Sequence, residues 1–166
     1  MSENTKLSDS DGVLLVKTAR QAVTEFLSNG NRMKLEAEHE KKFSFDSGVF
    51  VTLNKSDGLR GCIGFPMPEK KLSRAIVEGA IAAATEDPRF PPVTTKELDD
   101  IMFEVTVLTP PVEIDVSDPM EYLTKIKVGR DGLIVRHSFY SGLLLPQVPG
   151  EYGWGVAEFL QHACHK

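Results

Sequence analysis

The chain has few cysteines, no long hydrophobic run and no strong excess of charge. Its 166 residues include two cysteines, Cys62 and Cys164, which are too few for a disulfide framework and are not spaced as a metal-binding pair. No stretch approaches the roughly 18–20 apolar residues that span a bilayer. The N-terminus lacks the basic and then apolar pattern of a signal peptide. We therefore predict a cytoplasmic protein with free thiols, no bound metal and no membrane association.

The charge balance and the motifs that are absent narrow the function further. A net charge of -5 and a pI near 5.4 argue against nucleic-acid binding, because domains that bind nucleic acid are typically basic. There is no phosphate-binding loop and no dinucleotide fingerprint, since Gly61-x-x-Gly64 alone is far too weak a signal. No cofactor is predicted.

The composition, 41% hydrophobic and 26% charged, is that of a soluble globular protein with one core. Apolar periodicity and turn residues predict an α+β fold with a mainly antiparallel sheet, flanking helices and a smaller second lobe. Residues 1–8 read as a disordered tail, and residues 31–42 as a charged loop or irregular turn. The first helix is expected to begin at a cap, Ser10 or Asp11, and to end at Asn29. Further helices are expected over 70–85, 118–127 and 154–166, the last with Cys164 pointing inward. A short helical turn is expected at 94–97. Strands are expected over 48–53, 59–65, 101–108, 126–128, 133–137 and 143–145, with hairpin turns at 55–58 and 129–132, and 146–153 as a loop.

The most unusual segment is Leu59-Arg60-Gly61-Cys62-Ile63-Gly64, in the second strand of the first predicted hairpin. Side chains two apart share a face of a strand, so Arg60, Cys62 and Gly64 are predicted to point the same way. A cation would then lie beside a thiol and favour the reactive thiolate. Gly64 would leave an empty position for a ligand.

Three segments together resemble the AMMECR domain family. They are the hexapeptide Leu59–Gly64, the run Asp87-Pro88-Arg89-Phe90-Pro91-Pro92, and the stretch from Gly142 through Pro146-Gln147-Val148-Pro149-Gly150-Glu151-Tyr152-Gly153-Trp154 to Lys166. The resemblance implies an α+β fold in two lobes over residues 9–166 and a function that is not firmly established. It also implies association with Memo-like and radical-SAM proteins. The family pattern normally continues past Lys166, so the resemblance implies a domain truncated at its C-terminus.

Cys62 is the candidate nucleophile, and packing in a small space is the alternative. No base is identified, because His137, the best placed histidine, lies outside the three segments. Glu151 is a weak candidate for acid–base catalysis or a helix cap, and Glu104 is expected to pair with Arg60 or Arg89.

The predicted ligand site comprises Arg60, Gly61, Gly64, Arg89 and Gln147 around the thiol. It is roofed by the loops 89–92 and 147–154. Arg89 either binds an anionic group or bridges to Asp87. Whether the chain is an enzyme stays open. The first hypothesis is a small-molecule site with thiol-based group transfer. The alternative is a non-catalytic domain that docks a protein partner.

Overall fold

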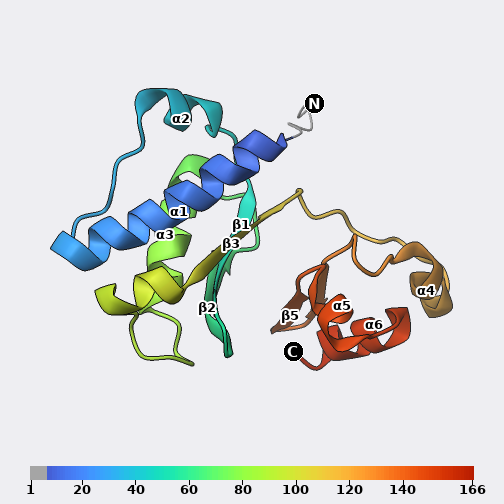
Figure 1. Cartoon of the computed structure of the whole chain (residues 1–166). Coiled ribbons are helices and arrows are strands. Elements are labelled where there is room, and N and C mark those ends of the chain that lie inside the picture. Colours follow the sequence, from blue (N-terminus) through green and yellow to red (C-terminus); the bar gives the residue numbers. More distant parts are fainter. Residues whose placement is uncertain (1–6) are drawn as a thin grey trace. The chain divides into compact units, whose positions relative to one another are not determined.

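The computed structural model describes residues 7–166 and divides them after Pro110 into two units, each with its own hydrophobic core (Figure 1). The α+β class predicted from the sequence is confirmed, with antiparallel strand pairs throughout. Of the predicted tail, residues 1–6 lie outside the described residues, whereas Ser8 caps the first helix. No helix in the described part of the chain is long and apolar enough to cross a membrane.

The first unit is built on a three-stranded antiparallel sheet in the order β2-β1-β3. Its strands are β1 (Gly48–Lys55), β2 (Gly58–Phe65) and β3 (Met102–Leu108). A turn at Ser56 and Asp57 joins β1 to β2. At its end, Gly58 has φ +122°, a backbone conformation that glycine adopts without steric cost. The hairpin predicted over these residues is therefore confirmed.

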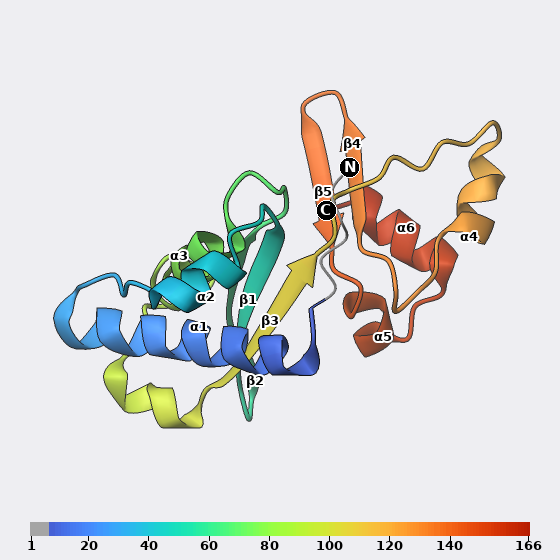
Figure 2. The ribbon, with the colours of Figure 1, turned by 90° about the horizontal axis from the view of Figure 1, so that it is seen from above.

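Two long helices, α1 (Asp9–Asn29) and α3 (Leu72–Thr85), pack on one another and cover the same face of this sheet (Figures 1 and 2). The segment predicted as loop or irregular turn contains α2 (Ala37–Lys42), and the turn predicted at 94–97 begins a 3-10 helix, η1 (Thr95–Asp100). Apolar side chains from the helices, the strands and the residues that follow α2 and η1 form the first core; the largest are Leu15, Val23, Phe43, Val49, Val51, Leu53, Leu72, Ile76, Ile81 and Ile101.

The cap of α1 lies earlier than predicted. Ser8, not Ser10 or Asp11, precedes the helix, and its hydroxyl accepts a hydrogen bond from the Asp11 N–H. The Asp11 carboxylate in turn accepts the Ser8 N–H at 2.9 Å. This reciprocal capping box begins the helix at Asp9. Its end is as predicted, because Gly30 adopts φ +75°.

The second unit contains one hairpin and several short helices. Its elements are η2 (Pro119–Glu121), α4 (Tyr122–Lys125), β4 (Leu133–His137), β5 (Tyr140–Leu144), α5 (Val148–Tyr152) and α6 (Val156–Cys164). Helix α6 packs on both strands. The second core is small and comprises Ile126, Leu133, Leu144, Phe159 and Ala163.

The hairpin predicted around 129–132 was wrong. The strand 133–137 pairs instead with 140–144, and its turn lies at Ser138 and Phe139. Residues 126–128 form no strand. The Asp131 carboxylate accepts the Lys127 N–H at 2.8 Å, so this glycine-rich segment closes a turn after α4.

Two further predictions at the C-terminal end needed correction. The segment predicted as loop contains α5, because Pro149 lies in its first turn, where a helix needs no N–H donor. Helix α6 begins at Val156 rather than at 154 and ends at Cys164. Cys164 was predicted to point inward, yet it is exposed, and Phe159 and Ala163 form the buried face.

Candidate functional site

Residues of the hexapeptide alternate between the two faces of β2. Gly61 faces α3 so closely that an added Cβ would lie 2.2 Å from the Ala83 carbonyl oxygen. Arg60 and Cys62 are therefore on the opposite face of the strand, away from α3. Figure 2 shows α3 and the strand in a second view. The shared face predicted for these two residues follows directly from the period of two.

The open position predicted at Gly64 is not open. A Cβ added there would lie 2.6 Å from the Phe50 ring and 2.1 Å from the Val49 carbonyl oxygen. Phe50 is paired with Gly64 across the sheet, and its side chain covers the glycine. The glycine makes room for a neighbouring aromatic ring rather than for a cavity.

The Asp87 carboxylate links the hexapeptide to the second resembling segment, Asp87–Pro92, which begins with this residue. Its carboxylate is buried, with a side chain 2% exposed, and accepts the Cys62 N–H at 2.8 Å. The same carboxylate binds Arg89 through Nε at 2.9 Å and Nη2 at 2.7 Å. Arg89 Nη2 also lies 3.4 Å from the Cys62 carbonyl oxygen. One buried carboxylate therefore fixes the Arg89 guanidinium against the backbone of Cys62.

The Cys62 side chain is half-buried among polar groups. The Thr52 hydroxyl, on the neighbouring strand β1, donates to Cys62 Sγ at 3.3 Å. Thr52 also pairs in register with Glu104 of β3, so these three residues form one row across the sheet. Arg89, with a side chain 52% exposed, is the cation held at Cys62.

Arg60 is directed elsewhere. Its Nε donates to Glu97 at 3.1 Å, and its Nη1 donates to the Pro91 carbonyl at 2.9 Å. Glu97 also accepts the Thr94 N–H and thereby completes the cap of η1. Glu97 and Asp87 bind these two arginines, and the predicted pairing of Glu104 with one of them stays a prediction. Arg60 thus ties β2 to the loop that follows Arg89.

Gln147 and Glu151 belong to the second unit, at the start of α5 and within it. Glu151 is exposed and does not cap α6, because the Gly155 N–H is bound instead by Glu158 at 2.9 Å. The predicted contribution of these two residues to a site with Cys62 stays a prediction.

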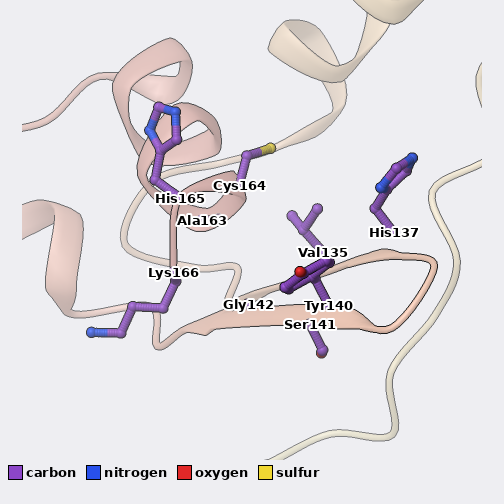
Figure 3. Close-up of a pocket in the computed structure, with 9 residues that line it drawn as sticks. All are labelled: Val135, His137, Tyr140, Ser141, Gly142, Ala163, Cys164, His165 and Lys166. Atoms are coloured by element: carbon purple, nitrogen blue, oxygen red, sulfur yellow. The ribbon is translucent and has the colours of Figure 1, made fainter.

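The second unit has a hollow of about 220 Å³ between the β4–β5 hairpin and the end of α6. Its lining includes Cys164, His137, His165 and Lys166. Figure 3 shows the His165 and Lys166 side chains pointing away from one another, and neither points toward His137. In the part of the chain that the structure describes, no group of three His, Cys, Asp or Glu side chains could hold a metal ion.

Known proteins resemble nearly the whole chain. A family model described as AMMECR1 matches residues 16–166. The chain belongs to the AMMECR1 family. A Methanopyrus kandleri protein is 51% identical over 97% of the chain and 79% of the relative. A Methanothermobacter thermautotrophicus protein is 51% identical over 96% and 83%. The crystal structure of the uncharacterized protein PH0010 from Pyrococcus horikoshii matches with a TM-score of 0.92 and 48% identity, covering 96% of this chain and 81% of that one.

Two residues of this candidate site were not singled out from the sequence. Glu97 was assigned only to the turn at 94–97, and Thr52 had no assigned role. A signal was present for Asp87, because it opens the second resembling segment and stands two residues before Arg89. The interpretation of Arg89 as a bridge to Asp87 is the one found in the structure.

The Asp87 and Glu97 carboxylates of the candidate site are held in their charged form. The Arg89 guanidinium, as the largest cause, lowers the pKa of Asp87 to about 2. The Thr94 N–H and then Arg60 lower the pKa of Glu97 to about 2. The hydrogen bonds that Arg89 donates to Asp87 raise the pKa of Arg89.

Acid should therefore weaken this AMMECR1 fold. In the unfolded chain both carboxyls titrate with a pKa of about 4. Because the folded pKa values are lower, the stabilisation is complete above about pH 4.5 and is lost as the pH falls toward 2. We expect the urea midpoint, followed by far-UV circular dichroism, to drop between pH 5 and pH 3. An Asp87→Asn/Glu97→Gln variant should show a shallower drop, and an equal drop would contradict this assignment.

Proposed function

We propose that the surface around Cys62 and Arg89 binds a small anionic molecule and that the Cys62 thiol accepts a covalent bond from it. The observation that carries the proposal is the shared carboxylate: Asp87 holds the Cys62 N–H and the Arg89 guanidinium together. More than half of the Arg89 side chain nevertheless stays exposed. A cation fixed at the Cys62 backbone is suited to orienting a charged substrate at that residue.

The chemistry of the two groups defines the substrate class. The planar guanidinium binds carboxylate and phosphate groups well. In a group transfer, a bond forms between Sγ and the electrophilic carbon, the bond from that carbon to its leaving group breaks, and the thiol proton departs with the leaving group. The thiolate is the reactive form. We therefore infer a substrate that carries an acidic group and a transferable carbon group.

Competitive alkylation tests this proposal. Iodoacetate carries a carboxylate and iodoacetamide does not, yet both place the same carbon on sulfur. We expect the iodoacetate-to-iodoacetamide rate ratio, measured by peptide mass spectrometry, to be roughly two- to fivefold higher for Cys62 than for Cys164, in line with one partly exposed charge. Cys164 is the internal reference, since it is the other free thiol and is exposed.

Arg89→Gln should bring the Cys62 ratio down to that of Cys164. The matched control is Arg74→Gln, which removes an exposed arginine from α3, where it bonds Glu78 at 2.6 Å. This control should leave the ratio unchanged. Equal ratios at the two cysteines of the unaltered protein, or labelling of Cys62 only in urea, would overturn the proposal.

A second candidate function is a non-catalytic domain that docks a protein. It is favoured by the hydrogen bond that Arg60 donates to the Pro91 carbonyl. This bond holds the loop after Arg89 in place, so that the loop can present a rigid surface to a partner. The family resemblance implies Memo-like and radical-SAM proteins as partners. In this function, residues 9–166 act as one domain that binds such a partner in the cytoplasm. Cys62→Ser should then preserve binding to such a partner, whereas Arg89→Glu should weaken it. Unchanged binding by a folded Arg89→Glu protein would count against this function.

A further inference from the structure

The hydrogen bonds of Cys62 determine which backbone groups of the edge strand β3 point out of the sheet. The Cys62 N–H and C=O bind side chains of the 87–92 segment rather than β1. Thr52 of β1 is opposite Cys62 on one side and Glu104 on the other. Its backbone groups therefore bond to Glu104, because both groups of a strand residue point to the same side. Along β3 this direction alternates from residue to residue. The residues whose N–H and C=O groups point outward are Phe103, Val105 and Val107.

The outer edge of β3 is open, whereas that of β2 is closed. Among residues 7–166, no hydrogen bond is made to the outward groups of β3. Just before the strand, the Ile101 carbonyl accepts a hydrogen bond from Arg20. Lysine, proline and a bulge are the usual means of blocking an edge. The segment Met102–Leu108 contains neither residue type, and its register with β1 is continuous. Such an edge readily pairs with another strand.

A second copy of β3 fits this edge when the two strands run antiparallel with Val105 opposite Val105. This is the alignment in which every residue of the strand faces another residue of the strand. Phe103 then lies opposite Val107. These are the residues with outward groups, and each such pair exchanges two backbone hydrogen bonds. Aromatic against β-branched and β-branched against β-branched are favourable cross-strand pairs.

The side chains on the other face of β3 agree with the same alignment. The exposed Met102 comes to lie opposite Leu108, and Glu104 lies opposite Thr106. Moving the two-fold axis one residue back would place the two Glu104 carboxylates opposite one another, which is destabilising. Moving it one residue forward would place Met102 opposite Pro110, outside the strand. Charge and apolar character therefore both favour the alignment on Val105.

We propose that the chain forms a two-fold dimer in which two β3 edges pair antiparallel about Val105 and join the two three-stranded sheets into one. The contact uses the same surface on both copies, so it closes at two subunits. The sheet grows no further, because Asp87 and Arg89 occupy the β2 edge at Cys62. Since β2 and β3 are opposite edges of the sheet, this inference stands independently of the proposed thiol chemistry.

Hydrogen exchange followed by NMR, together with sedimentation equilibrium, tests the dimer. We expect a monomer–dimer equilibrium between roughly 5 and 500 µM, as for a small two-fold interface. In the monomer the outward amides of β3 should exchange rapidly, and in the dimer at least tenfold more slowly. The amides of Glu104 and Thr106 point toward β1 and should be protected in both states.

Charge changes at Thr106 test the alignment itself. Thr106→Glu places an acid opposite Glu104 of the other copy at two symmetric positions, so the dissociation constant should rise roughly two- to thirtyfold. Thr106→Lys should not weaken the dimer, and the double variant Glu104→Lys/Thr106→Glu should restore it. The matched control is Thr24→Glu, which adds the same charge at an exposed position of α1 and should change nothing. Far-UV circular dichroism verifies that each variant is folded.

Four results would overturn the proposal. The first is a chain that stays monomeric over the whole range, and the second is a dimer whose outward β3 amides exchange as fast as those of the monomer. The third is protection of these amides already in the monomer. The fourth is a monomer in which an added Val-Thr-Val-Thr-Val peptide protects them, which would assign the edge to an extended segment of another protein. Failure of the alkylation experiment on Cys62 would leave all four readouts unaffected.

Discussion

Replacing Gly61 by alanine is expected to unfold the first unit or to destabilise it by about 3 kcal/mol or more. The added methyl would lie 2.2 Å from the Ala83 carbonyl oxygen, which belongs to the backbone of α3 and cannot rotate away. Relief therefore requires that β2 and α3 move apart. Such a movement would open the core around Ile76 and Leu53. Urea unfolding followed by far-UV circular dichroism measures the effect.

Gly12→Ala is the matched control for this variant. Gly12 lies in α1, and an alanine Cβ there would meet nothing within 4 Å. Because alanine is a better helix former than glycine, this variant should be neutral or more stable by up to about 1 kcal/mol. A Gly61→Ala protein with the urea midpoint of the unaltered chain would show that the strand and helix do not pack as closely as described.

Replacing Asp87 by alanine is expected to cost about 2–4 kcal/mol. The change leaves the Cys62 N–H without its acceptor and removes the buried counter-ion of Arg89. It should also release the Cys62 amide to hydrogen exchange and erase the preference of Cys62 for iodoacetate. Circular dichroism, exchange and alkylation thus report on the same carboxylate in three ways.

Asp99→Ala, at an exposed position in η1, is the control and should stay within about 0.5 kcal/mol of the unaltered protein. A cycle with Arg89→Ala separates the two roles of Asp87. If the ion pair carries most of the effect, Asp87→Ala should cost little once Arg89 is gone. If the Cys62 N–H carries it, the cost should persist in the Arg89→Ala background. An effect below 0.5 kcal/mol in both backgrounds would contradict the described hydrogen bonds.

The first unit was largely predictable from the sequence because its signals are local. The period-two pattern of 101–108 and the glycine stop after Asn29 follow from backbone geometry alone. The second unit was read less well. Both Gly129 with Gly132 and the turn at Ser138 could close a hairpin. In the structure the hairpin turn lies at Ser138, a non-glycine residue at φ +53° that no sequence rule favours.

The candidate site was likewise predictable only in part. That Arg60 and Cys62 share a face followed from strand alternation, and Asp87 was already a considered partner of Arg89, but the acid that binds Arg60 was not predicted. Glu97 is 37 residues from Arg60 in sequence, and only the tertiary fold brings them together. The sequence also did not show that the position at Gly64 is filled, because the side chain that fills it, Phe50, comes from the neighbouring strand. Which carboxylate meets which cation is decided by tertiary packing, and one sequence does not encode it locally.

The separate cores have a practical consequence for anyone who measures this protein. Trp154 is the chain's single tryptophan and packs against the small core of the second unit. Its fluorescence therefore follows local opening of that unit, which has the smaller buried core. Local opening commonly occurs below the global transition, so a melt read by fluorescence would give an early midpoint. Chaperone, proteolysis or shelf-life studies based on that signal would describe the unit that holds about one third of the residues, and not the unit that holds Cys62.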